Sequence, residues 1–185
     1  MHNEEFIGPT TSISQEIDMM KYRQKDESFN DKIKRMAKAL SDNKEHQYDL
    51  EKIFGNMRFL PAGRVQAAIG SNRITTAYNC FVSGVIDDNM DSIMGKASEA
   101  AETMRRGGGI GYDFSKIRPR GDKIKSLDSQ ASGPVSFMGI YDAVCQTIAS
   151  SGHRRGAQMA VLRVDHPDIE EFVTSKRNSD KLTGF

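Results

Sequence analysis

The clearest structural signal lies in residues 77–107, AYNCFVSGVIDDNMDSIMGKASEAAETMRRG. Residues 77–85 are rich in β-branched and aromatic side chains, which is typical of a β-strand. Asp87 and Asp88 are then expected to cap a helix that ends at Gly107. The apolar side chains of this helix recur on one face: Met90, Ile93, Met94, Ala97, Ala101 and Met104. A strand followed directly by a helix is the first half of an α/β unit.

A second helix and a second strand follow further along the chain. Pro134 comes directly after Ser132-Gly133 and predicts the first turn of a helix, which continues through apolar residues until Gly152. Residues 157–164 again have the composition of a strand. The local order is therefore strand, helix, loop, helix, strand, which favours an α/β fold.

The N-terminal part of the chain has a different character. Residues 1–57 are highly charged, and helical spacing of apolar residues is visible in residues 14–25 and residues 28–40. From Phe59 the composition shifts to Gly, Ala and β-branched residues. We therefore expect a short helical module over residues 1–57 and an α/β domain over residues 58–185.

Composition excludes several classes of protein. The chain has 26 basic and 25 acidic residues, a net charge of +1, so no global field attracts a nucleic-acid polymer or a membrane surface. The sequence contains neither a long apolar run nor a signal peptide, so we expect a cytoplasmic protein. The two cysteines, Cys80 and Cys145, are expected to be thiols, and their spacing suggests no metal site.

A dense glycine run occupies residues 105–114, RRGGGIGYDF. Glycines let the backbone turn sharply and approach another chain or a ligand closely. A dinucleotide-binding fingerprint follows a strand and opens a helix, whereas this run follows a helix, so the fingerprint fails on context. The alternative is a turn that ends the helix and binds no ligand.

Two basic segments follow the glycine run. Residues 116–123, KIRPRGDK, form a loop stiffened by Pro119, which could bind phosphates or could be a solvated basic loop. Residues 150–157, SSGHRRGA, join a helix end to a strand start and suit either a polyphosphate or a mobile contact loop. His153 in this second segment is assigned no catalytic role.

The two cysteines differ in their sequence context. Strand alternation places Asn79 and Cys80 on opposite faces of the first strand. A free cysteine is usually an inert buried side chain, so composition alone leaves Cys80 open between a packing role and a redox role. Cys145 lies in the middle of a helix among apolar neighbours and is expected in the core.

Seven motifs occur in a fixed order along the chain: FLPAGR (59–64), NC (79–80), DNMDSI (88–93), the glycine run with RPRG (107–121), ASGPVSFM (131–138), RRGA (154–157) and DHPDI (165–169). Taken in order, these pieces resemble the catalytic subunit of ribonucleotide reductase, over residues 50–185. The glycine run, SGPVSFM and RVDHPDI are most similar to the adenosylcobalamin-dependent class, although the di-metal class shares the architecture.

The resemblance implies the first part of a ten-stranded α/β barrel, incomplete in this chain. In the family a thiyl radical activates the ribose, and two further cysteines reduce it while closing to a redox-active disulfide. Cys80 matches the first of these two reducing cysteines, and Asn79 and Ala62 match substrate contacts. The implied substrate is a ribonucleotide, and the implied reductant is thioredoxin-like.

The resemblance also implies allosteric control by a deoxynucleoside triphosphate or ATP effector at the interface of a homodimer. Asp88 matches the residue that meets the effector's sugar or base, and Arg118 matches a phosphate ligand, with Arg120 close by. A second effector loop corresponds to residues 150–156 and supplies Gly152, Arg154 and Arg155. The helices that begin near Asp88 and at Pro134 are expected to pack against their copies in the dimer.

The radical-forming segment and the second reducing cysteine of the family have no counterpart in residues 1–185. We therefore expect activity only with a complementary C-terminal part of the reductase. The radical would come from adenosylcobalamin, bound mainly by the completed enzyme, or from a di-metal partner subunit. The alternatives are a stand-alone regulatory nucleotide-binding module and an inactive remnant.

Overall fold

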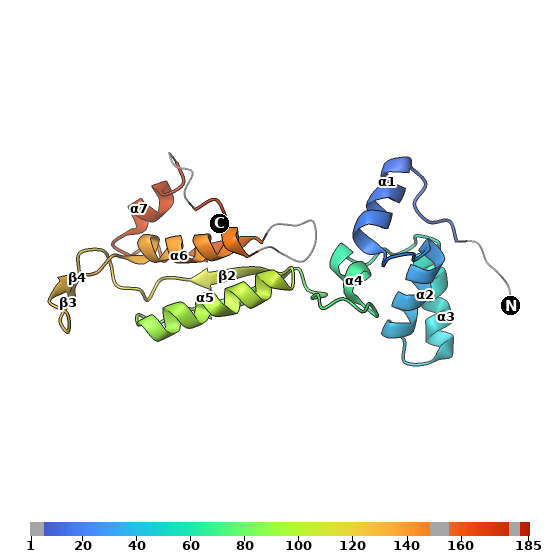
Figure 1. Cartoon of the computed structure of the whole chain (residues 1–185), viewed down its shortest axis with the longest axis horizontal. Helices are drawn as coiled ribbons and strands as arrows, with labels where there is room; N and C mark the ends of the chain where they lie inside the picture. Colours follow the sequence, from blue (N-terminus) through green and yellow to red (C-terminus); the bar gives the residue numbers. More distant parts are fainter. Residues whose placement is uncertain (1–5, 149–155, 178–181) are drawn as a thin grey trace. The chain divides into compact units, whose positions relative to one another are not determined.

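The computed structural model describes residues 6–148, 156–177 and 182–185. The chain divides into two compact units, Met1–Tyr78 and Asn79–Phe185 (Figure 1). Neither unit has, among the described residues, a helix long and apolar enough to cross a membrane.

The regular elements in the described part of the first unit are all helices. α2 begins after Ser28, whose side chain accepts the amide of Asp31 in a capping box, and its span coincides with the expected one. The helix expected over residues 14–25 begins two residues earlier, at Ser12, and ends three residues earlier, at Tyr22. The bounds are α1 Ser12–Ile17, η1 (a π-helix) Asp18–Tyr22, α2 Phe29–Leu40, α3 Lys44–Gly55 and α4 Gly63–Ala68. α3 and α4 were not predicted from the sequence.

A buried polar network fastens α4 to α2. Lys32 is only 1% exposed, and its ammonium donates to Asp18 and, at 3.0 Å, to Gln66. Burial lowers the pKa of Lys32, while the hydrogen bond and charge of Asp18 oppose that shift. Gln66 also donates to the carbonyl of Pro61 at 2.7 Å, and the Arg35 guanidinium donates to the Gln66 carbonyl at 3.1 Å.

This network ties residues beyond position 57 to the helical unit. A buried charge needs partners, and the partner Gln66 lies beyond residue 57, where the sequence placed the boundary. Residues 58–78 therefore group with the helical unit, and the compact α/β unit begins at Asn79.

The second unit is α/β. Its larger sheet contains three parallel strands in the order β1-β2-β5, and β3 and β4 form a separate antiparallel pair. The bounds are β1 Cys80–Val85, α5 Met90–Arg105, β2 Gly109–Asp113, β3 Lys123–Ile124, β4 Ser129–Gln130, α6 Pro134–Thr147, β5 Gln158–Val161 and α7 Ile169–Thr174. The α/β class is confirmed, and the strands do not close into a barrel.

The glycine run contains a strand that the sequence did not predict. α5 ends at Arg105, and Gly107 reverses the chain direction with a φ of +84°. β2 begins two residues later, at Gly109. β2 is the central strand, paired with β1 on one side and β5 on the other. Glycine is unfavourable in strands, so Gly109 and Gly111 concealed β2 from a prediction based on strand propensity.

The start of α5 also differs from expectation. The N-cap is Asn89, whose side chain accepts the amide of Ser92 at 2.8 Å, so the prediction that Asp87 and Asp88 cap the helix was wrong. The buried face carries Ile93, Ala97, Ala100 and Met104, whereas the predicted members Met90 and Met94 are about half exposed.

The core of the second unit lies between the sheet and two helices. α5 and α6 run alongside β2 (Figure 1), and the Tyr112 and Tyr141 rings lie 4.8 Å apart, edge to face, between strand and helix. Gln158 of β5 accepts the Tyr112 hydroxyl at 2.9 Å and donates to the Tyr141 carbonyl at 3.0 Å. The Tyr141 hydroxyl donates to the Ile93 carbonyl at 2.7 Å. Burial raises the pKa of Tyr141 to about 12, so this hydroxyl stays protonated as a donor.

Asp18→Ala should destabilise the helical unit by about 3 to 5 kcal/mol, because it leaves the Lys32 ammonium buried without its counter-charge. Chemical denaturation of the full chain, followed by circular dichroism, measures the loss. Glu16→Ala is the matched control, since Glu16 is exposed on the preceding helix. Equal midpoints for the two variants would contradict a structural role for the buried pair.

Candidate functional site

Cys80 lies on the face of the sheet that α5 and α6 leave uncovered. Phe81 pairs with Ile110, whose side chain is buried in the core between sheet and helices. Because side chains alternate along a strand, Cys80 and Val82 point to the opposite face. The Cys80 thiol is exposed, and Val82 is 87% exposed. This uncovered side is called the open face below.

On the open face, the β2 residues beside the Cys80 thiol are glycines. Cys80 pairs with Gly109, and a Cβ placed on Gly109 would meet the Cys80 sulfur at 3.4 Å. Gly111 is the next β2 residue on this face, and Met159 of β5 lies against it. The absence of side chains at Gly109 and Gly111 lets a ligand approach the backbone next to the thiol.

Cys145 has the opposite environment. It is buried in α6, its thiol lies 3.5 Å from the Gly156 carbonyl, and burial raises its pKa. A buried thiol with a raised pKa is a poor nucleophile and a poor metal ligand. The structure therefore separates the two cysteines into an exposed thiol on the sheet and a core thiol in a helix.

The two predicted substrate contacts lie in different units. Asn79 immediately precedes β1 in the second unit, and its carbonyl accepts the Gly109 amide at 2.9 Å. Asn79, like the adjacent Cys80, is exposed. Ala62 is the N-cap residue of α4 in the first unit, and it is exposed there.

Two predicted effector residues meet at one edge of the sheet. Arg118 follows β2 and donates from Nε to Asp88, which follows β1, at 2.5 Å. A second ion pair, between Lys116 and Asp87 at 3.0 Å, joins the same two loops. The carboxyl ends of parallel strands share an edge, which is why loops that are 30 residues apart in sequence come together.

The Arg118–Asp88 pair is partly open to solvent. Their side chains are 38% and 30% exposed, and such pairs typically contribute about 1 kcal/mol or less. Each group retains hydrogen-bonding capacity, because a guanidinium carries five donors and a carboxylate accepts several bonds. An anionic ligand could therefore displace or join this pair at a small cost.

Arg120 lies near Arg118 in sequence but is bound elsewhere. Its guanidinium makes a 2.6 Å ion pair with Glu171 of α7 and lies 3.3 Å from the Ser136 hydroxyl of α6. The structure does not place it with Arg118 and Asp88. The predicted effector residues Gly152, Arg154 and Arg155 lie outside the described residues.

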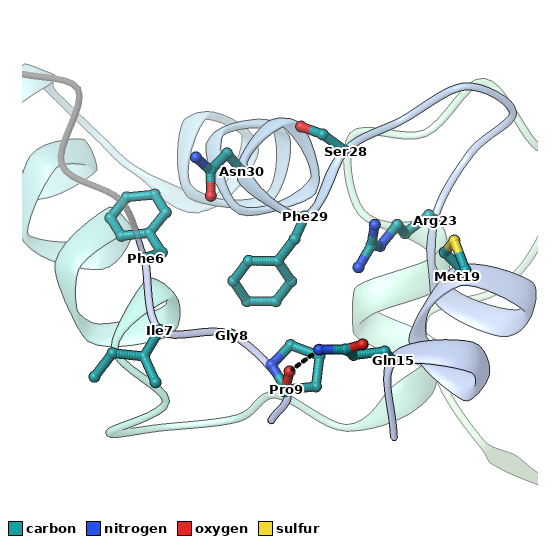
Figure 2. A pocket seen from close by; sticks show the side chains of 10 residues that line it. All are labelled: Phe6, Ile7, Gly8, Pro9, Gln15, Met19, Arg23, Ser28, Phe29 and Asn30. Carbon is teal, nitrogen blue, oxygen red and sulfur yellow. Dashed lines mark hydrogen bonds between the residues drawn. The ribbon is translucent and has the colours of Figure 1, made fainter. Parts of the chain in front are cut away.

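A pocket of about 420 Å³ lies in the first unit, and none of its lining residues was predicted as a site residue. Figure 2 shows the Phe29 ring at its centre, with the Arg23 guanidinium carbon 5.8 Å from the ring centroid. Gln15 donates to the Pro9 carbonyl at 3.0 Å along one wall. The lining residues are Phe6, Ile7, Gly8, Pro9, Gln15, Met19, Arg23, Ser28, Phe29 and Asn30.

Sequence reasoning did not identify the residues that hydrogen-bond the backbone of the basic loop, residues 116–123. His166 is 8% exposed and bonds the Ile117 carbonyl at 2.8 Å, and Asp168 accepts the Arg120 amide at 2.8 Å. The available signal was the DHPDI motif, which carried the resemblance but received no role. Within the described part of the chain, no three His, Cys, Asp or Glu side chains gather as a metal site.

Comparisons with known proteins agree on one family. The family described as "Ribonucleotide reductase, barrel domain" matches residues 78–183. A vitamin B12-dependent ribonucleoside-diphosphate reductase of Mycobacterium tuberculosis is 46% identical over 124 residues, which cover 67% of this chain and 18% of that protein. A reductase of the same description from Thermoplasma acidophilum is 36% identical over 132 residues, covering 71% of this chain and 17% of that protein.

A solved structure matches more of the chain. The Actinobacillus ureae class Id ribonucleotide reductase alpha subunit superimposes with a TM-score of 0.74 over 89% of this chain and 30% of that chain. Its sequence identity of 21% makes this a likeness of fold. The chain spans less than a fifth of the length of the two B12-dependent relatives. The chain belongs to the ribonucleotide reductase large-subunit family, and residues 78–183 correspond to part of its barrel domain.

Proposed function

We propose that this chain supplies part of the substrate-reducing face and of the specificity site of a ribonucleotide reductase. The observation that carries this proposal is the exposed Cys80 thiol on the open face, beside the bare backbone of Gly109. The relatives described as ribonucleoside-diphosphate reductases support a ribonucleoside diphosphate as substrate.

The chemistry assigned to Cys80 is a two-electron reduction. The Cys80 thiol and a second thiol from the rest of the enzyme provide two electrons and two protons. The ribose loses its 2′-hydroxyl as water and gains a hydrogen at that carbon, and the two sulfurs join as a disulfide. A thioredoxin-like reductant then regenerates both thiols. Asn79, adjacent to Cys80, and Ala62 are proposed to contact the substrate.

The radical that begins this reaction is assigned to other parts of the enzyme. Adenosylcobalamin supplies a radical when bound, and the B12-dependent relatives support this source over a di-metal partner subunit. Among the described residues, no three His, Cys, Asp or Glu side chains gather as a metal site, and the buried His166 has both ring nitrogens bonded within the protein. The cofactor is therefore proposed to bind the completed enzyme.

The Arg118–Asp88 pair is the proposed core of the effector site. Arg118 would bind the phosphates of a deoxynucleoside triphosphate or ATP, and Asp88 would accept a hydrogen bond from its sugar or base. We place this site at a homodimer interface formed by α5 and α6. The exposed Met90 and Met94 side chains on α5 support that placement, because exposed apolar side chains on one helix suit burial against a partner.

The isolated chain should form no deoxyribonucleotide, and mixing it with a polypeptide that supplies the remaining barrel strands should restore product. Chromatographic detection of deoxyribonucleotide measures both outcomes. Turnover by the isolated chain would contradict the proposal. Effector binding without any restored turnover would favour the alternative of a regulatory nucleotide-binding module.

Cys80→Ser in the completed enzyme should stop multiple turnover with thiol reductants, because serine cannot close the disulfide. Effector affinity should stay within about twofold, since Cys80 lies outside the Arg118–Asp88 site. Cys145→Ala is the matched control and should retain turnover. Normal turnover by Cys80→Ser would return this thiol to a packing role.

Arg118→Ala should weaken triphosphate binding about ten- to hundredfold, because removing a charge-assisted hydrogen bond typically costs about 1.5 to 3 kcal/mol. Isothermal titration calorimetry measures the affinity, and product ratios measure base selection. Lys123→Ala is the control, since this exposed lysine pairs with Asp128 in the β3–β4 hairpin. Equal affinities in Arg118→Ala and Lys123→Ala would contradict the assignment of the effector site.

A further inference from the structure

The three residues His166, Pro167 and Asp168, called here the HPD turn, form hydrogen bonds with the loop that carries Arg118. The His166 side chain bonds the carbonyl of Ile117 at 2.8 Å, and the Asp168 carboxylate accepts the amide of Arg120 at 2.8 Å. These two backbone groups lie immediately before and two residues after Arg118. The HPD turn therefore holds the peptide groups on both sides of the Arg118-Pro119 pair.

The loop needs this support because Pro119 disfavours an ordinary closed turn over residues 117–120. A type I turn over residues 117–120 would place Pro119 at the third position, where proline is disfavoured. Proline also pushes the preceding residue, Arg118, away from the helical backbone region that this turn requires. The groups that would close the turn, Ile117 C=O and Arg120 N–H, bond instead to the HPD turn.

The imidazole is fixed at both nitrogens. Nδ1 of His166 accepts the amide of Asp168 at 3.1 Å, so the ring hydrogen must lie on Nε2, which donates to the Ile117 carbonyl. The ring is 8% exposed, which shields both bonds from water. Because the Ile117 carbonyl belongs to the peptide plane that leads into Arg118, this contact orients the Arg118 backbone.

Arg120 and the start of α6 add further contacts that hold the Arg118 loop. The Arg120 side chain reaches Glu171 at 2.6 Å and the Ser136 hydroxyl at 3.3 Å, which ties the loop to α7 and α6. Gly133 leaves the room for the Asp168–Arg120 bond. A Cβ on Gly133 would lie 2.7 Å from the Asp168 carboxylate and 3.0 Å from the Arg120 amide nitrogen.

We propose that His166 and Asp168 are positioning residues for the triphosphate site, acting through Arg118. In this assignment Arg120 belongs to the same support and is not a phosphate ligand. The inference rests on the proposed function, because it takes Arg118 as the residue that meets the effector phosphates. It adds the reason for the DHPDI motif, which would otherwise have no role in the site.

The test is a double-mutant cycle between His166 and Arg118 in the full chain combined with the rest of the barrel. Each of the four deoxynucleoside triphosphates is titrated by calorimetry. His166→Leu should weaken binding about three- to tenfold, the effect of losing one hydrogen bond. His166→Gln, which keeps a side-chain N–H donor, should recover most of the affinity. In an Arg118→Ala background, His166→Leu should have no further effect.

A control and a second measurement accompany the cycle. Asp165→Ala is the matched control, because Asp165 is exposed and its carboxylate pairs with the nearby Arg163 at 2.7 Å. Hydrogen exchange at the Arg120 amide, without any nucleotide, should accelerate in Asp168→Ala and stay unchanged in Asp165→Ala. Arg120→Ala should reduce triphosphate affinity less than Arg118→Ala.

The outcomes separate the two proposals. Equal losses from His166→Leu with and without Arg118 would mean general destabilisation and would overturn the positioning role. Unchanged exchange at the Arg120 amide in Asp168→Ala would show that the HPD turn does not hold the loop backbone, and would overturn the proposal. If Arg118→Ala binds triphosphates as the unmutated chain does, the proposed effector site is wrong, and the positioning role falls with it. The exchange result still decides whether the HPD turn holds the loop.

Discussion

The alternation along β2 is the constraint on which the α/β unit depends. Ile110 and Tyr112 point into the core beneath α5 and α6, while Gly109 and Gly111 face the other side without side chains. A single short strand therefore closes the core and leaves the open face bare beside Cys80. Larger residues at the two glycines would crowd the Met159 side chain and the Ala157 carbonyl. Core packing and access to the thiol are thus set by the same five residues.

Polar interactions divide into two kinds according to burial. In the helical unit, Lys32 is sealed from water, so its bonds to Asp18 and Gln66 cannot be given up without a large cost. At the sheet edge, Arg118 and Asp88 are partly exposed, so their pair is cheap to rearrange. The first kind suits a structural support, and the second suits a site where a charged ligand competes for the same groups.

Some helices could be predicted from local sequence patterns, whereas one strand and one helix cap could not. Ser28 before an apolar periodic run and Pro134 after Ser-Gly are strong helix starts, and α2 and α6 begin where these residues place them. β2 was missed because glycine is unfavourable in strands. The cap of α5 was misplaced because Asp87, Asp88 and Asn89 are all suitable caps, and only the path of the chain selects among them.

The sequence by itself determined the α/β class, the family resemblance, the position of Cys80 at a strand, and the basic loop that holds Arg118. The tertiary structure alone decided which charged residues meet. Arg118 pairs with Asp88, 30 residues away, and Arg120 pairs with Glu171, 51 residues away. Neighbours in sequence thus acquire different partners, because the parallel strands bring one loop to Arg118 while the HPD turn and α7 approach Arg120. Side-chain pairing over such separations follows from the path of the folded chain, which local sequence patterns do not encode.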